Sequence, residues 1–174
     1  MNIIDPYRIY NKSLPLTVFV DNSNNFISWA IKWRTAGIYN HVMNMKNSYS
    51  FLSQNPTGLK VVPLDKYLKR NIKLKFWEII CTKEQRNEIL SEMDKDSNLP
   101  WYKTMYDFLG IFGQAIGIRK LNNPFKMFCQ ERNAKYLRIV DKDFPLNLSP
   151  EGANEYMKTK PLFYKVYGYW MADV

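Results

Sequence analysis

The sequence is poor in the residues that build disulfide frameworks and zinc sites. Its 174 residues include two cysteines, Cys81 and Cys129, and one histidine, His41. These three side chains cannot form the several disulfides of a small secreted scaffold, nor complete the four Cys and His ligands of a structural zinc site. Any metal would need carboxylate oxygens as ligands, and we expect no metal and no other cofactor.

Long apolar runs are absent as well. No stretch reaches the roughly 18 to 20 apolar residues that a membrane-spanning helix requires. Asp5, Pro6 and Arg8 come before any apolar stretch, which is the wrong order for a secretory signal peptide. We therefore expect no transmembrane segment, and synthesis in the cytoplasm with both thiols reduced.

Acidic residues are too few to balance the basic ones. The chain has 25 Lys and Arg against 16 Asp and Glu, a formal net charge of +9. A positive field attracts polyanions, and nucleic acid, anionic lipid and acidic cell-wall polymer all fit this description. The basic residues are scattered along the chain and form no arginine-rich arm, which argues against nucleic acid as the partner.

The rest of the composition is that of a globular protein. Hydrophobic residues make up 46% of the chain and aromatic residues 16%, with only 7 Gly and 9 Pro. Such a chain can bury a core and is neither collagen-like nor disordered throughout. Its length suits one domain. We expect a single domain over residues 1–174, with residues 1–15 as an N-terminal arm.

Hydrophobic periodicity divides the chain into strands and helices. Strand patterns cover residues 16–20, 38–45, 49–54, 59–62, 73–80 and 162–169. Helix patterns run from the polar turn 21–25 to Gly37 and cover residues 63–68, 83–94, 102–118, 128–140 and a short segment from residue 150. Together they predict an α+β fold, a mainly antiparallel sheet with helices packed on it.

Local signals mark several of these boundaries. Thr82 and Gln85 have the spacing of a capping box, and Ser149-Pro150 places Ser at an N-cap and Pro at the first helical position. Residues 94–99 are polar and predict a break after the capped helix. Lysines alternate with apolar residues over 73–80, which predicts a strand whose basic outer face is solvated.

Cys129 and His41 are the candidate chemical groups. Cys129 lies in the first turn of a predicted helix, where the positive end of the helix dipole favours a thiolate. His41 lies in a predicted strand and could serve as the base for a nucleophile that is distant in sequence. Most single cysteines are buried packing residues, and a hydrogen-bonded core histidine is equally ordinary. We interpret Cys81 as a packing residue.

A third group would be needed to orient the imidazole of His41. Ser53 and Gln54 are the polar residues of the neighbouring predicted strand. Their side chains point to opposite faces of the sheet, so at most one of them can contact the imidazole. The sequence leaves the choice between them open.

Short motifs recur in an order that resembles a known family. They are the strand 16–20, then Ser28, Ile31 and Thr35, Asn40-His41-Val42, residues 58–67, Tyr106-Asp107, Phe128-Cys129-Gln130-Glu131 and residues 149–152. This order resembles the circularly permuted papain-like hydrolases of the NlpC type, especially the YiiX-like branch, and more distantly the lecithin retinol acyltransferase group. The resemblance implies a permuted papain-like fold.

The resemblance also implies roles for individual residues. Cys129 would be the nucleophile, His41 the general base, and the backbone N–H of Cys129 part of an oxyanion hole. Ser53 aligns best with the third member, with Gln54 beside it as the alternative. Near the site the resemblance places three further residues, Tyr106, Gln130 and Glu131.

Two functions follow as hypotheses. The first is a cysteine hydrolase, an amidase or peptidase, acting on cell-wall peptide or, next, on a fatty-acyl amide or ester. The second is a papain-like module without activity that has a structural or binding role, for example in a virus particle. The second hypothesis is motivated by the absence of a carboxylate at the third position, because Ser accepts a weaker hydrogen bond from imidazole.

Overall fold

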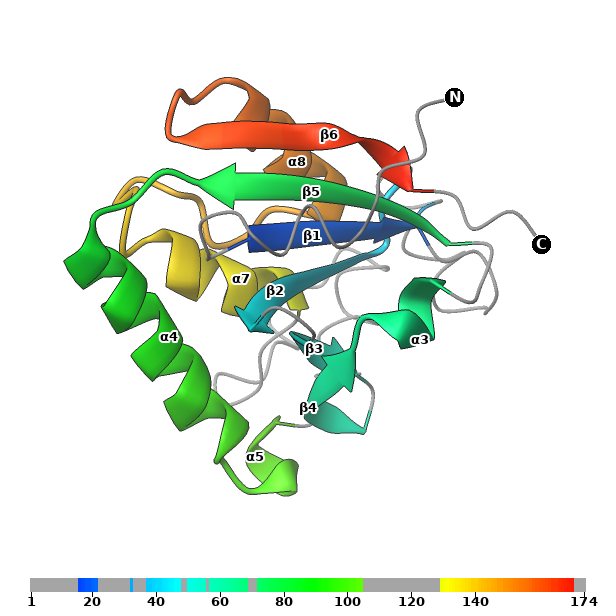
Figure 1. Cartoon of the computed structure of the whole chain (residues 1–174), viewed down its shortest axis with the longest axis vertical. Helices are drawn as coiled ribbons and strands as arrows, with labels where there is room; N and C mark the ends of the chain where they lie inside the picture. Colours follow the sequence, from blue (N-terminus) through cyan, green and yellow to red (C-terminus); the bar gives the residue numbers. More distant parts are fainter. Residues whose placement is uncertain are drawn as a thin grey trace.

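The fold is a six-stranded antiparallel sheet with helices packed against it (Figure 1). The computed structural model describes residues 16–21, 32, 37–47, 50–55, 57–68, 72–104 and 129–170. Within these ranges, no helix combines the length and the apolar character that crossing a bilayer would require. The expected α+β class is confirmed.

The first four strands of the chain form a meander, and the last two extend the sheet beyond the first strand. The strands are β1 Leu16–Asp21, β2 His41–Asn47, β3 Ser50–Asn55, β4 Gly58–Pro63, β5 Lys73–Ile79 and β6 Phe163–Trp170. Their spatial order is β4-β3-β2-β1-β5-β6. Gly58 has φ 112° and pairs with Asn55, so the tight turn between β3 and β4 uses a backbone conformation that glycine adopts at little cost. The strands expected within 38–45, 49–54 and 59–62 thus pair consecutively as an antiparallel meander.

The helices begin where the capping residues indicate. They are α3 Asp65–Leu68, α4 Lys83–Ser97, α5 Trp101–Thr104, α7 Cys129–Leu137 and α8 Pro150–Lys158. At the start of α4, the Gln85 N–H donates to Thr82 Oγ1 and the Thr82 N–H donates to Gln85 Oε1. At the start of α8, Ser149 Oγ accepts the Gly152 N–H at 3.0 Å. Both predicted caps are confirmed.

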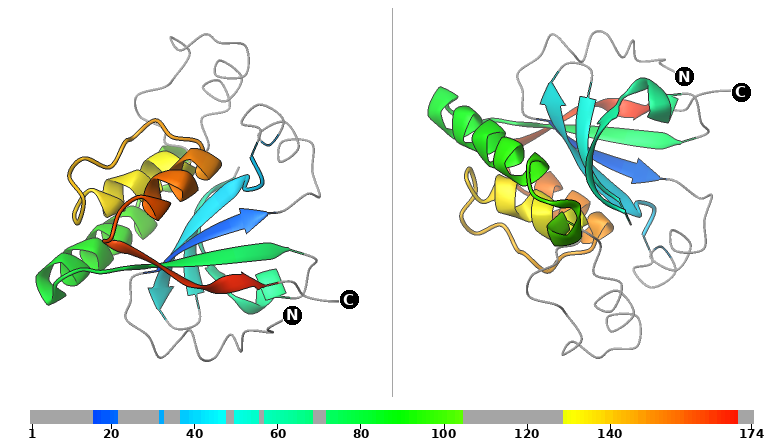
Figure 2. Two further views of the ribbon diagram at one scale, coloured as in Figure 1. Left: turned by 90° about the horizontal axis from the view of Figure 1, so that it is seen from above. Right: turned by 90° about the horizontal axis from the view of Figure 1, so that it is seen from below.

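The two faces of the sheet carry different apolar cores. Helices α7 and α8 lie on one of these faces (Figure 2). On one face α7 and α8 cover a cluster of side chains that includes Phe19, Tyr39, Val42, Trp77, Cys129, Ala134, Leu137, Phe144, Ala153, Met157 and Phe163. On the other face a second cluster includes Val18, Val20, Met43, Met45, Phe51, Leu64, Leu74 and Phe76, with Tyr67 of α3 packed against it. We call these the α7 face and the α3 face. Alternation along each strand assigns every side chain of the sheet to one of them.

The strand predicted from residue 38 begins only at His41. Glu151 at the start of α8 explains the difference, because its Oε2 accepts the backbone N–H of Ile38 at 2.8 Å and of Tyr39 at 3.3 Å. The Asn40 N–H then donates to the Val20 carbonyl at 3.1 Å. Backbone donors that would otherwise extend β2 are thus bound by a carboxylate from a distant helix.

Two further expectations were wrong. Residues 94–97 continue α4 instead of breaking it, because Asp96 is buried against α7 and binds its side chains. The basic face of β5 is not solvated at Lys75, which is 4% exposed. The Lys75 ammonium donates to Asn154 Oδ1 at 2.6 Å and lies 5.0 Å from the centre of the Trp77 ring, so its charge is held by an amide and an aromatic face.

Several expected elements lie outside the described residues. These are the arm 1–15, the helix expected before Gly37 apart from Lys32, the part of the segment 102–118 beyond Thr104, Tyr106-Asp107 and Phe128.

Candidate active site

Cys129 is the first residue of α7. Its side chain is 6% exposed and belongs to the apolar cluster of the α7 face, together with Phe19 and Val42. The position in the first turn is the one that the sequence predicts. A thiol there lies at the end of the helix where the helix dipole favours negative charge.

His41 is the first residue of β2 and is hydrogen-bonded to Ser53. The distance from Nε2 to Ser53 Oγ is 2.9 Å. Met43 pairs with Ser53 across the two strands, so His41 and Ser53 are diagonal neighbours with side chains on the same face. Ser53 Oγ also lies 3.3 Å from the Tyr67 hydroxyl and 3.5 Å from Asn55 Oδ1. The imidazole therefore belongs to a polar group on the α3 face.

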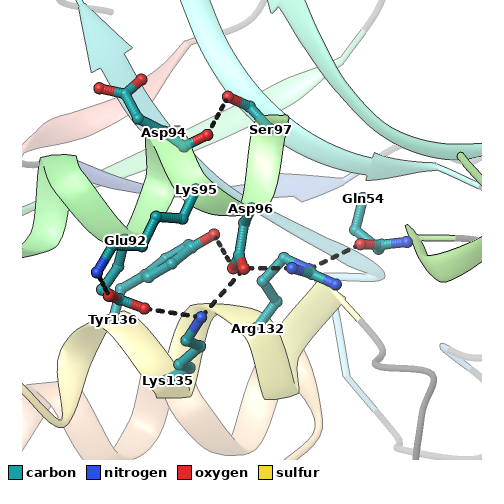
Figure 3. A network of polar contacts seen from close by, with 9 residues as sticks. All are labelled: Gln54, Glu92, Asp94, Lys95, Asp96, Ser97, Arg132, Lys135 and Tyr136. Carbon is teal, nitrogen blue, oxygen red and sulfur yellow. Dashed lines mark hydrogen bonds and ion pairs between the residues drawn. The ribbon is translucent and has the colours of Figure 1, made fainter. Parts of the chain in front are cut away.

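Gln54 faces the other way. Its Oε1 accepts the Arg132 Nε–H at 2.9 Å, and its Nε2 donates to the Thr104 carbonyl (Figure 3). The amide thus connects β3 to α7 and α5. Of the two polar residues that the sequence left open, Ser53 is the one whose side chain reaches His41.

Cys129 and His41 lie at the same end of the sheet. Arg132 contacts Gln54 near the end of β3, and Cys129 lies about one helical turn before Arg132, towards the end where β2 begins. The side chains approach that end from opposite faces, however. Val42 points to the α7 face, and His41 pairs with Val20, whose side chain is on the α3 face. The pairing of Cys129 with His41 stays a prediction.

Burial sets the protonation state of His41. Desolvation lowers the pKa of the imidazole from 6.5 to about 4, because the charged form loses its hydration. At neutral pH the ring is uncharged and keeps one N–H. When Nε2 donates to Ser53, Nδ1 carries the lone pair that could accept a proton.

This pKa makes the stability of the protein depend on pH. The unfolded chain binds a proton at His41 near pH 6.5, and the folded chain only near pH 4. The contribution of His41 to the free energy of unfolding should be complete above pH 6.5 and should fall by about 2 to 3 kcal/mol as the pH drops towards 4. Urea denaturation between pH 4 and 7 measures it, and His41→Gln is the control in which this part of the slope should disappear.

The single histidine also gives a direct measurement. Its imidazole proton resonance is unique in the NMR spectrum of the chain, and we expect it to titrate near pH 4. A midpoint near 6.5 would contradict the burial of the ring.

The expected near-site residues are only partly described. Gln130 is 2% exposed, and its Oε1 accepts from Asn133 Nδ2 at 3.3 Å. Glu131 follows it on α7 and is partly buried. Tyr106 lies outside the described residues, so its role stays a prediction.

Glu151 is a residue that the sequence did not point to. Its Oε2 holds the backbone just before His41, and its Oε1 accepts from Asn154 Nδ2 at 3.0 Å. Asn154 in turn accepts from Lys75. Glu151 and Ile38 are 113 residues apart. The local pattern identified Glu151 only as the first turn of a helix, and no local signal could have indicated its partner.

Comparison with known proteins gives a fold. No family model matches the chain, and no curated protein matches it in sequence. A solved structure does match, that of the metalloprotein YiiX of DUF1105 from Escherichia coli O157:H7. The TM-score is 0.51 and the identity 17%, and the match covers 92% of this chain and 99% of that one. The chain has the fold of YiiX. This is a papain-like fold, as expected from the motif order.

The likeness to YiiX concerns the fold alone. YiiX is described as a metalloprotein. In the described part of this chain, no three His, Cys, Asp or Glu side chains come together in a way that could hold a metal ion. We derive no metal chemistry for this chain.

Proposed function

We propose that this protein is a thiol hydrolase in which Cys129 attacks the carbonyl carbon of an amide or ester. The main support is the position of Cys129 at the start of α7, at the end of the sheet where His41 is bound to Ser53. The papain-like fold is a second support. A thiolate at a helix N-terminus is an activated nucleophile.

Each residue has a defined task in the proposed reaction. His41 Nδ1 takes the proton of the Cys129 thiol, the resulting thiolate adds to the carbonyl carbon, and the carbonyl oxygen becomes an oxyanion. His41 passes a proton to the leaving group, and a thioester forms. Water then attacks the thioester, with His41 as base. Ser53 accepts the Nε2–H and so directs Nδ1 towards the reacting atoms. The task requires Nδ1 to come within about 3 to 4 Å of the sulfur.

The substrate class is part of the proposal. A peptide amide of the bacterial cell wall is the first choice, because the net charge of +9 favours approach to an anionic polymer. A fatty-acyl amide or ester is the second choice.

A non-catalytic papain-like module is the second candidate function. Specific observations favour it. His41 and Cys129 point to opposite faces of the sheet, and Cys129 is 6% exposed. A pKa of about 4 also makes His41 a weak base at neutral pH. Such a module would have a binding or structural role, for example in a virus particle.

Alkylation of the two thiols separates the candidates. We expect iodoacetamide to label Cys129 at pH 6 at least about 10-fold faster than Cys81, because a thiolate reacts and a thiol does not. Burial raises the pKa of the Cys81 thiol, so Cys81 is an internal control in the same chain. Peptide mass spectrometry measures both rates between pH 5 and 9. His41→Ala should abolish the difference.

The opposite result is equally clear. Both thiols could label only near the ordinary thiol pKa of about 8.5, with no effect of His41→Ala. That outcome would reject the hydrolase and leave the non-catalytic module.

A further inference from the structure

Gln130 has a buried hydrogen-bond donor for which the described residues offer no acceptor. The side chain is 2% exposed and follows Cys129 directly in the first turn of α7. Its Nε2 is buried and has no hydrogen-bond partner among the residues that the structure describes. Buried amide donors are nearly always paired, because an unpaired one loses its hydration without compensation. This exception therefore needs an explanation.

The oxygen of the same amide does have a hydrogen-bond partner. Oε1 accepts from Asn133 Nδ2 at 3.3 Å, and Asn133 Oδ1 accepts from the Thr17 hydroxyl at 3.2 Å. Asn133 and Thr17 are both fully buried. These bonds fix the amide plane with Oε1 towards the body of α7, so Nε2 is directed away from Asn133. The donor is therefore held in place, with no hydrogen bond to a described residue.

A simple packing role does not account for this amide. Cys129 and Ala134 of the same helix belong to the apolar cluster of the α7 face, and a Leu at position 130 would fill a similar volume without an unpaired donor. Gln130 follows Cys129 in the same turn of α7. The oxygen of a carbonyl group that the sulfur attacks would be a fitting partner for an unused donor in this turn.

We infer that the side-chain N–H of Gln130 is a donor of the oxyanion hole for acyl groups at Cys129. The inference rests on the proposed thiol hydrolase. In the acylation step a sulfur lone pair forms the S–C bond, and the C=O π pair moves onto oxygen, where Nε2–H donates to it. When that pair returns, the bond to the leaving group breaks. The leaving group departs with the electron pair of that bond and receives the proton that the imidazole took from the thiol, and nothing is oxidised or reduced.

Two reagents distinguish oxyanion stabilisation from thiol reactivity. Iodoacetamide alkylates the sulfur by displacement at a saturated carbon, so no oxyanion forms. p-Nitrophenyl acetate acylates the sulfur through a tetrahedral oxyanion. In Gln130→Leu we expect the alkylation rate of Cys129 to be unchanged and the acylation rate to fall by about 10²-fold, the usual loss for one donor. The melting temperature should fall slightly, because the variant removes the unpaired donor but also the acceptor of Asn133 Nδ2. The ratio of the two rates is therefore the readout of the test.

Each outcome has one meaning. Suppose that Cys129 is alkylated fast and that Gln130→Leu is acylated as fast as the unaltered protein. This result would overturn the inference but not the proposed function. A lower melting temperature of Gln130→Leu with an unchanged ratio of the two rates would have the same meaning. Slow alkylation and no acylation of the unaltered protein would overturn the proposed function, and the inference with it. Should Gln130→Leu fail to fold, Gln130→Asn, with its donor displaced by one methylene, is judged by the same ratio.

Discussion

Replacing Asp96 by Ala should lower the free energy of unfolding by about 3 to 5 kcal/mol, as expected when one partner of a buried ion pair is removed. Asp96 is 5% exposed near the end of α4. Its carboxylate accepts from Arg132 Nη1 at 2.8 Å, from the Tyr136 hydroxyl at 2.8 Å and from Lys135 Nζ at 3.1 Å (Figure 3). All three donors come from α7, so this carboxylate fastens α4 to the helix that begins with Cys129.

The loss of stability should be large because Asp96→Ala leaves buried donors without their acceptor. The side chain of Arg132 is only 6% exposed, and without Asp96 its charge would stay buried with only Gln54 as an acceptor among the contacts described here. Burial, with the charge of Asp96 adding to it, raises the pKa of Tyr136, so its hydroxyl remains a donor that also loses its acceptor. Buried donors that lose their acceptors incur the desolvation penalty in full.

Asp94 is a matched control on the same helix. It pairs with Lys46 at 3.0 Å, but its side chain is 61% exposed. Exposed ion pairs contribute little, so Asp94→Ala should cost no more than about 1 kcal/mol. Urea denaturation at pH 7 compares the two variants. Similar small losses for both would show that the buried network does not hold α4 and α7 together.

Replacing Ser53 by Asp should raise the pKa of His41 from about 4 to about 7. A carboxylate about 4 Å from the imidazolium contributes about 4 kcal/mol at an effective dielectric constant of about 20, which is about 3 pKa units. The site can accept the charge, because the Tyr67 hydroxyl lies 3.3 Å from Ser53 Oγ and can donate to the new group. The variant supplies the carboxylate that the predicted third position lacks.

Ser53→Asn is the control for this prediction. Asn has nearly the shape of Asp and no charge, so the imidazole should still titrate near pH 4. The single histidine resonance measures both variants directly. If His41 of Ser53→Asp also titrates near pH 4, the introduced carboxyl is protonated or lies away from the ring. In that case the group at position 53 does not determine the pKa of His41.

Local signals explain how much of the fold could be predicted. Thr82 with Gln85 and Ser149 with Pro150 act within one turn of helix, so both caps were visible in the sequence. The alternation of apolar and polar residues marked the strands. It also placed the side chains of Ser53 and Gln54 on opposite faces of the sheet. The sequence could not show which of these two residues lies on the same face as His41, because that depends on the register of β2 against β3.

Long-range polar contacts explain what could not be predicted. Lys75 looked solvated because its strand alternates, but Asn154 of α8 and the Trp77 ring enclose it. Asp96 looked like part of a polar break, but α7 provides three donors to it. In each case, a polar residue is buried by a partner far away in the chain, and composition and periodicity carry no information about that partner.

Strand β4 lies at an edge of the sheet, and its sequence affects whether molecules of this protein associate at high concentration. Edge strands can pair with another chain and start aggregation. The β4 edge has an exposed Val61, which would favour such pairing, but Lys60 beside it is also exposed, and Pro63 has no N–H to donate. A copy of β4 added here would bring a second exposed lysine to the edge, and Pro63 would offer it no N–H. These two residues make β4 a poor template for growth of the sheet beyond one molecule.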